Sequence, residues 1–228
     1  MKRLVDLTQP IITGHWRYNN EIKAHSDMHQ GAYSNVTYYT MRTHMFTHID
    51  AQKHQLADGQ EMPDYPLDIY IGRASFIDLT DIQPNEAIDA ERMKKAFEKS
   101  GCEQTDRLIL KTCWGLQRDW TTHDYWDDAP YITRDGAQYL ASLGPRLVGY
   151  DFPQDYDIRM FEKKPRGECV LPVHQEVLVK ANIMQIEYMH YLWDVPVNNF
   201  DIYALPLKLR EGPLDGAQIR VVAAYEEA

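Results

Sequence analysis

The chain has 228 residues, of which 44% are hydrophobic and 25% charged, and its formal net charge at pH 7 is −10. This length suits one sizeable domain or two small ones, and the composition is that of a globular protein. The negative charge argues against a nucleic-acid or anionic-membrane partner, which would require a basic surface. Three cysteines without a Cys-x-x-Cys pair indicate reduced thiols in a cytoplasmic protein. We expect neither a signal peptide nor a transmembrane segment, because no apolar run is long enough.

The predicted elements describe an α/β domain whose strands outnumber its helices. Strands are predicted at residues 3–7, 35–43, 73–79, 107–112, 147–150, 183–187, 203–209 and 218–223. Helices are predicted from residue 85 or 86 to 97, from 133 to 143, and from 174 to 180. Asn85 and Thr133 are expected as N-caps, and Gly101 as a left-handed stop. Because the order is not a strict strand–helix alternation, we expect a mixed sheet in one layered domain spanning residues 1–228.

The segment from His44 to His54 is the part of the chain richest in chemistry, with His44, His48, Asp50 and His54 within eleven residues. On a straight strand His44 and His48 would lie roughly 13 Å apart, too far to share a metal ion. On a regular helix Asp50 would point away from the two histidines. We therefore expect a strand that ends near His44, followed by a tight turn that returns His48 and Asp50 to it. Unrelated core or surface histidines are the alternative, which suits one histidine better than three beside an aspartate.

This segment resembles the His-x-Gly-Thr-His-x-Asp-x-Pro-x-x-His motif of the cyclase family, which includes bacterial kynurenine formamidase and isatin hydrolase. Further segments that resemble the family lie at residues 6–11, 111–114, 148–151, 186–188, 204–209 and 215–223. The resemblance therefore extends over nearly the whole chain. It implies a swivelling β/β/α fold, a homo-oligomer (dimer or tetramer), a small-molecule substrate, and one or two divalent ions of zinc or manganese.

The resemblance also implies roles for individual residues. His44, His48 and Asp50 match the family's metal ligands, and His54 matches its catalytic acid/base. Glu187 matches the glutamate that bridges the metals. Trp16 lies near the position of an aromatic residue that stacks on the substrate, in a loop where Trp16, Arg17 and Tyr18 suit stacking and carboxylate pairing. Trp114, Tyr125 and Trp126 are equal candidates for the substrate pocket.

Three departures from the family pattern bear on the site. Phe46 replaces the usual glycine and Gln52 the usual proline, so the turn could follow a different backbone path. In the family a histidine lies twelve positions before the glutamate, where this chain has Gln175, with His174 one position further back. Either a one-residue slip brings His174 to the metal, or Gln175 reaches it through the amide oxygen. Zinc prefers imidazole and manganese an oxygen ligand, and we favour a single ion.

The chemistry of these residues predicts metal-assisted hydrolysis. A divalent ion lowers the pKa of bound water from 15.7 to about 7, which supplies hydroxide to attack a carbonyl carbon at neutral pH. His54, four residues beyond Asp50, can protonate the leaving amine. We therefore expect a hydrolase that cleaves the C–N bond of an aryl formamide or a cyclic amide. Two alternatives remain open: an ester or lactone hydrolase on the same site, and a non-catalytic metal-dependent binding protein with the same fold.

Overall fold

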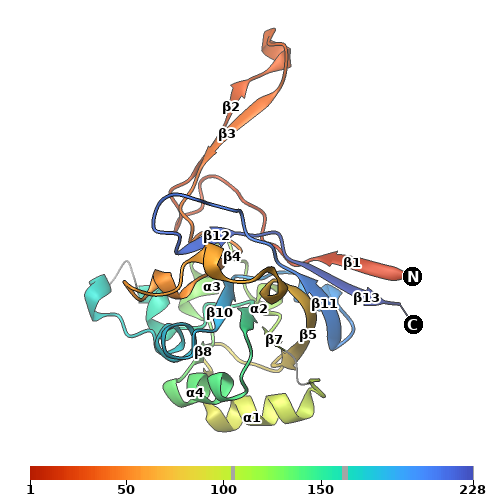
Figure 1. Ribbon diagram of the computed structural model, residues 1–228, viewed down its shortest axis with the longest axis vertical. Helices are drawn as coiled ribbons and strands as arrows, with labels where there is room; N and C mark the ends of the chain where they lie inside the picture. The colour runs from red at the N-terminus through yellow and green to blue at the C-terminus, as the bar shows by residue number, and fades with distance from the viewer. Residues whose placement is uncertain (104–105, 161–163, 228) are drawn as a thin grey trace.

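The computed structural model describes residues 1–103, 106–160 and 164–227. Its centre is a curled nine-stranded sheet in the order β1-β13-β11-β5-β7-β9-β10-β4-β12 (Figure 1). The strands are β1 (Lys2–Asp6), β4 (His48–Asp50), β5 (Ile71–Asp78), β7 (Arg107–Lys111), β9 (Leu147–Tyr150), β10 (Met184–Glu187), β11 (Asn199–Tyr203), β12 (Gly216–Gln218) and β13 (Val222–Glu226). Strands β5, β7, β9 and β10 are parallel, and the flanking strands are antiparallel. The predicted α/β class with a mixed sheet is confirmed.

The parallel strands form the centre of the core because both of their faces are buried. Alternate residues of β7 point to opposite sides: Leu108 and Leu110 join one apolar cluster, and Ile109 joins the other. Near-continuous apolar strands of this kind are typical of sheets covered on both faces. One cluster also contains Met93 and Leu140 from the covering helices.

The helices α1 (Ala90–Lys99) and α4 (Arg134–Ser142) lie next to each other at one side of the sheet (Figure 1). The remaining elements are α2 (Trp114–Gln117), α3 (Asp124–Asp127), a π-helix (His174–Lys180), the paired strands β6 (Ala87–Ile88) and β8 (Tyr131–Ile132), and 3-10 turns at Met28–Gln30, Gln52–His54, Met62–Asp64, Leu67–Ile69, Tyr156–Met160, Arg166–Glu168 and Leu192–Asp194. As predicted, Thr133 caps α4 by accepting a hydrogen bond from the Gly136 amide.

Some predicted boundaries are wrong. The first helix is capped by Asp89 rather than Asn85, because residues 87–88 form β6 and Asn85 adopts a left-handed φ of 58°. The strand predicted at 203–209 ends at Tyr203, and Pro206 makes only an isolated bridge, since proline cannot donate to a ladder. The strand predicted at 218–223 is the junction between β12 and β13. Apolar residues are buried on both sides of this break, so the hydrophobic pattern of the sequence did not reveal the break.

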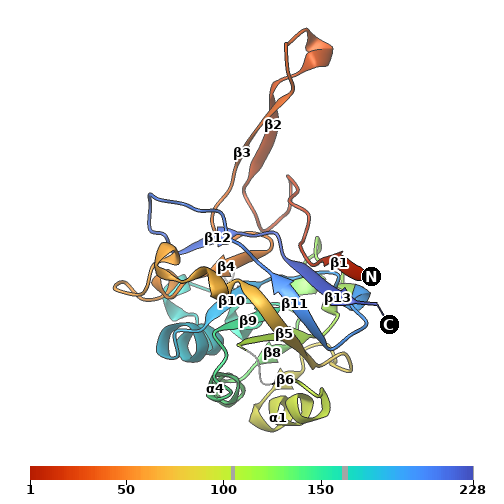
Figure 2. The ribbon, with the colours of Figure 1, turned by 45° about the vertical axis from the view of Figure 1, so that its right-hand side comes forward.

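The strands β2 (Glu21–Ser26) and β3 (Val36–Thr40) form a long hairpin, here called the arm, that projects from the body (Figures 1 and 2). Almost every arm residue is exposed, including the apolar Ile22, Val36, Tyr38 and Tyr39. A two-stranded hairpin is marginally stable in water without a surface to pack on. The arm therefore exposes apolar side chains that the same chain does not cover.

In the described ranges, no helix has the length and apolar character required to cross a membrane. The organisation of residues 1–228 as one domain stays a prediction.

Candidate metal centre

The site is built where β4 and β10 pair. His48 and Asp50 are two residues apart on β4, so their side chains share one face of the strand. Antiparallel pairing places Glu187 of β10 directly opposite His48. The prediction that His48 and Asp50 lie in a turn is therefore wrong: they lie on a strand, and β3 ends at Thr40, before His44. His44 reaches Asp50 from the bend that precedes β4.

In this bend, Phe46 stands where a glycine was expected. Phe46 has a φ of 54°, in the left-handed region that glycine adopts without steric cost. Its side chain is completely buried, with the ring 4.8 Å from that of Tyr18. Burial of a phenylalanine contributes about 1.5–3 kcal/mol, which offsets a left-handed backbone cost of about 1–2 kcal/mol. The substitution is therefore compatible with the same turn.

Three acceptor groups converge at the strand pair. The Nδ1–H of His48 donates to the carbonyl of Phe46 over 2.8 Å, which leaves Nε2 to present its lone pair. This Nε2 lies 3.2 Å from Asp50 Oδ1 and 3.6 Å from Glu187 Oε2. In the described part of the chain, His48 Nε2 and Asp50 Oδ2 are buried without a hydrogen-bond partner. Buried acceptors that face one another fit a bound cation.

His44 completes this group. Its Nδ1 lies 2.8 Å from Asp50 Oδ1, and one ligand atom each of His44, His48 and Asp50 falls within 4.8 Å of the others. These donors are of the kinds that bind zinc and similar divalent ions.

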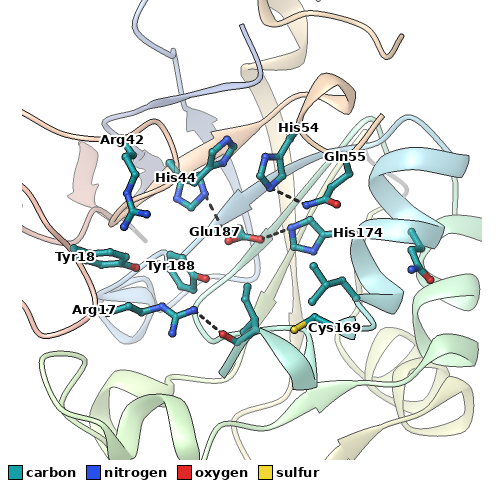
Figure 3. Close-up of a pocket in the computed structure, with 14 residues that line it drawn as sticks. Arg17, Tyr18, Arg42, His44, His54, Gln55, Cys169, His174, Glu187 and Tyr188 are labelled. Atoms are coloured by element: carbon teal, nitrogen blue, oxygen red, sulfur yellow. Dashed lines mark hydrogen bonds and ion pairs between the residues drawn. The ribbon is translucent and has the colours of Figure 1, made fainter. Parts of the chain in front are cut away.

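The structure places His174, and not Gln175, beside these acceptors (Figure 3). His174 Nε2 lies 3.2 Å from Glu187 Oε1, and its Nδ1–H donates to Asp155 over 2.6 Å. The Gln175 side chain instead accepts a hydrogen bond from Arg134 over 2.6 Å. Residues 174–180 form a π-helix, which closes i→i+5 and so holds an extra residue per turn relative to an α-helix. That extra residue accounts for the thirteen-position spacing between His174 and Glu187.

Gln52 stands in place of the expected proline, and its side chain stabilises the turn that carries His54. Its amide donates to the carbonyl of Val179 over 2.8 Å and accepts from the Gln60 amide over 3.1 Å. The first of these bonds links the 3-10 turn Gln52–His54 to the π-helix. A proline could not make either side-chain bond.

His54 lies at the same cluster, with its ring centroid 3.7 Å from that of His44 and 5.7 Å from that of His174. Its Nε2 lies 3.1 Å from Gln55 Nε2, which can donate to it. Ligand atoms of Asp50, His54 and His174 also fall within 4.8 Å of one another. Its position is therefore compatible with carrying protons and with binding an ion.

Two carboxylates that support the histidines were not predicted. Asp215 Oδ2 lies 2.7 Å from His44 Nε2 and 3.9 Å from His54 Nδ1. Asp155 orients His174 in the same manner. Such carboxylate–histidine pairs fix ring orientation at metal sites and increase ligand basicity. The only local signal was that Asp215 belongs to a segment that resembles the family.

In this cluster, charged neighbours shift the pKa values more than burial does. Burial lowers the pKa of His44, but Asp50 and Asp215 raise it to about 10. Burial raises the pKa of Asp50, but the neighbouring imidazoles, first His44, hold it well below its usual value. Burial likewise lowers the pKa of His174, which Asp155, Asp50 and Glu187 raise well above its usual value. The carboxylates therefore favour the protonated forms of His44 and His174, and a bound cation would replace these protons.

The cluster lies at one side of a cavity of about 460 Å³ (Figure 3). Arg17, Tyr18, Arg42 and Tyr188 also line the cavity. Trp16, predicted to stack on substrate, is not among the lining residues; its ring stacks on His123 at 3.8 Å between centroids. Tyr18, two residues after Trp16, is the aromatic residue of this loop that lines the cavity.

Replacing His174 should show whether His174 or Gln175 binds the metal. We expect His174→Ala to weaken zinc or manganese binding at least about 100-fold, because supporting groups alone account for 10–100-fold. Gln175→Ala, the matched neighbour, should bind the metal as the unaltered chain does. Competition with a chromophoric chelator measures both affinities, and equal loss in the two variants would contradict the assignment.

Comparison with known proteins identifies the family of this chain. The family model described as putative cyclase matches residues 5–154. The kynurenine formamidase of Bacillus anthracis is 31% identical over 188 residues, which are 82% of this chain and 79% of that protein. The kynurenine formamidase of Salinibacter ruber is 32% identical over 183 residues, 80% and 76% of the two chains.

Solved structures have the same fold. A structure described as a potential metal-dependent hydrolase with cyclase activity has a TM-score of 0.70 at 25% identity and covers 100% of both chains. Isatin hydrolase A from Labrenzia aggregata has a TM-score of 0.76 at 20% identity, covering 99% of this chain and 94% of the other. The matched family model covers more than half of this chain, which therefore belongs to the putative cyclase family, as its His44–His54 segment predicted.

Proposed function

We propose that this chain is a metal-dependent hydrolase that cleaves the C–N bond of a small aryl formamide or cyclic amide. The observation that carries the proposal is the convergence of His48 Nε2 and Asp50 Oδ2, buried without a hydrogen-bond partner in the described ranges, at one side of a cavity. The kynurenine formamidases among its relatives support a formamide, and the isatin hydrolases that share its fold suggest the cyclic amide. The bond cleaved is not a peptide bond.

We propose that His44, His48, Asp50, Glu187 and His174 hold the divalent ion. Imidazole and carboxylate donors suit zinc and manganese, and an imidazole at position 174 favours zinc. We favour one ion, although five donors with Asp50 shared would also suit two. When bound, such an ion supplies a water whose pKa is lowered to about 7.

His54 is the proposed acid/base. Its ring lines the cavity beside the cluster, and its Nδ1 lies 3.9 Å from Asp215 Oδ2. As water adds to the carbonyl carbon, His54 takes the proton that the water loses. It returns this proton to the nitrogen as the C–N bond breaks, so a formamide gives a neutral amine and formic acid, which then releases its own proton to solvent as formate forms.

Chelation tests the metal requirement. The purified protein should hydrolyse formanilide, N-formylkynurenine or isatin, lose this activity after dialysis against a chelator, and regain it with zinc or manganese. A spectrophotometric assay over aryl amides, lactams and lactones measures the turnover. Metal-loaded protein that turns over none of these compounds would contradict the proposal, and tight binding without turnover would indicate a binding protein.

A second measurement distinguishes amide from ester hydrolysis. An amine leaves only when protonated, whereas an alkoxide needs less help, so His54→Ala should lower amide turnover about 10²–10⁴-fold and ester turnover much less. His29→Ala, an exposed histidine on the arm, serves as the control and should change neither rate. Equal losses for the amide and the ester in His54→Ala would argue against the acid/base role.

We also propose that the chain forms a homo-oligomer through the arm. The support is the exposure of Tyr38 and Tyr39, at 48% and 56%, on a hairpin that lacks a covering surface. Replacing both residues by serine should therefore lower the molar mass measured by light scattering to that of one chain. An unaltered protein that is already monomeric would contradict this proposal. A cytoplasmic location stays a prediction, supported by three free cysteines.

A further inference from the structure

We propose that the substrate of this site carries a carboxylate next to its aryl amide, and that Arg42 binds this carboxylate. The inference rests on the proposed function and adds a substrate class to it. It begins from the wall of the cavity that does not hold the histidine cluster.

Arg42 presents an unpaired guanidinium to the cavity. Figure 3 shows its side chain directed inward on the side of Tyr18. Across residues 1–103, 106–160 and 164–227, no oxygen accepts a hydrogen bond or an ion pair from this guanidinium. The chain has 34 acidic residues against 24 lysines and arginines, so partners are plentiful. Arginines that do form ion pairs include Arg3, Arg73, Arg92, Arg118, Arg134, Arg146 and Arg220.

The nearby carboxylates do not need Arg42 for charge balance. Asp50 and Asp215 face His44, and Glu187 faces His48 and His174. A divalent ion at these residues would make the region still less negative. The positive charge of Arg42, beside His44 at the cavity, is therefore left to attract an anion from solution (Figure 3).

Two neighbours of Arg42 add donors to this wall. Arg17 is held in place, because it donates to the Ile158 carbonyl over 2.6 Å and its guanidinium carbon lies 4.0 Å from the ring centroid of Trp126. The Tyr18 hydroxyl is buried and has no hydrogen-bond partner in the described residues. Arg17, Tyr18 and Arg42 line the same side of the cavity (Figure 3).

Arg42 and Tyr18 suit a carboxylate. A planar guanidinium donates two parallel hydrogen bonds to a carboxylate, and a tyrosine hydroxyl can donate a third. Ile158, Leu171 and Tyr188 also line the cavity and supply apolar surface for an aryl ring.

The carboxylate must lie close to the reacting amide. Arg42 precedes His44 by two residues, so their Cα atoms are at most about 7 Å apart. The cavity of about 460 Å³ is at the small end of the range for ligand pockets. A single ring that bears both groups therefore meets the two walls, which points to formamidobenzoates and related aryl amides.

The experiment compares formamidobenzoates, as ortho, meta and para isomers, with their uncharged methyl esters. We measure kcat/KM for amide cleavage by the metal-loaded chain and by Arg42→Ala, Arg42→Lys and Arg42→Glu. For each isomer we compare the acid-to-ester ratio of kcat/KM between variants. The intrinsic reactivities of the acid and the ester are the same for every variant, so they cancel in this comparison. Arg210→Ala removes one exposed positive charge outside the cavity lining and is the matched control.

We expect Arg42→Ala to lower the acid-to-ester ratio at least about tenfold for the preferred isomer, because a charge-assisted pair is lost. Arg42→Lys should retain part of the ratio, and Arg42→Glu should favour a formamidobenzylamine, whose ring carries a cation. Arg210→Ala should leave the ratio unchanged. Salt should raise KM for the acid and not for the ester.

The outcomes separate this inference from the proposed function. Cleavage of acid and ester with a ratio that does not respond to Arg42 would overturn the inference and leave the hydrolase intact. Failure to cleave any aryl formamide or cyclic amide, neutral or charged, would overturn the proposed function and the inference with it.

Discussion

Buried acceptor atoms that face one another are the constraint on which the site depends. His48 presents a lone pair to Asp50 and Glu187 because its other nitrogen is committed to a backbone carbonyl. Carboxylates removed from water are costly unless a positive charge meets them. Protonated imidazoles can supply this charge, and so can a metal ion. This arrangement of buried acceptors therefore gives the cluster affinity for a cation.

The sheet produces this arrangement by pairing strands from distant parts of the chain. Strand β4 lies between β10 and β12, so residues 48–50 meet Glu187 on one side and the segment that begins at Asp215 on the other. The π-helix adds His174, whose ring Asp155 orients. Each donor is thus held by backbone pairing or by a second hydrogen bond, and little conformational entropy remains to be lost when a ligand binds.

The cavity has two chemically different walls. One holds imidazoles and carboxylates, which suit a cation and the proton transfers of hydrolysis. The other holds Arg17, Tyr18 and Arg42, which suit an anion. This division is local, because the chain as a whole carries a net charge of −10. Overall charge therefore described the outer surface and not the environment that a substrate meets.

Local patterns in the sequence determined much of this protein. The apolar runs predicted the central strands, Thr133 predicted a helix start, and the His44–His54 segment predicted the family, because each signal lies within a few consecutive residues. Boundaries that depend on partners were missed: Asn85 was mistaken for a cap, and the break between β12 and β13 was invisible, since apolar residues flank both sides of it.

Only the tertiary structure decided which distant groups meet. Spacing left His174 and Gln175 as equals, and the π-helix turned His174 towards Glu187. Asp215 gained significance from its contacts with His44 and His54, and Arg42 from the cavity that it lines, and no local pattern encodes either. Phe46 shows the same limit, because its left-handed backbone is tolerated through contacts with residues far along the chain. A sequence specifies its donors locally, whereas strand pairing and packing decide which of them share a site.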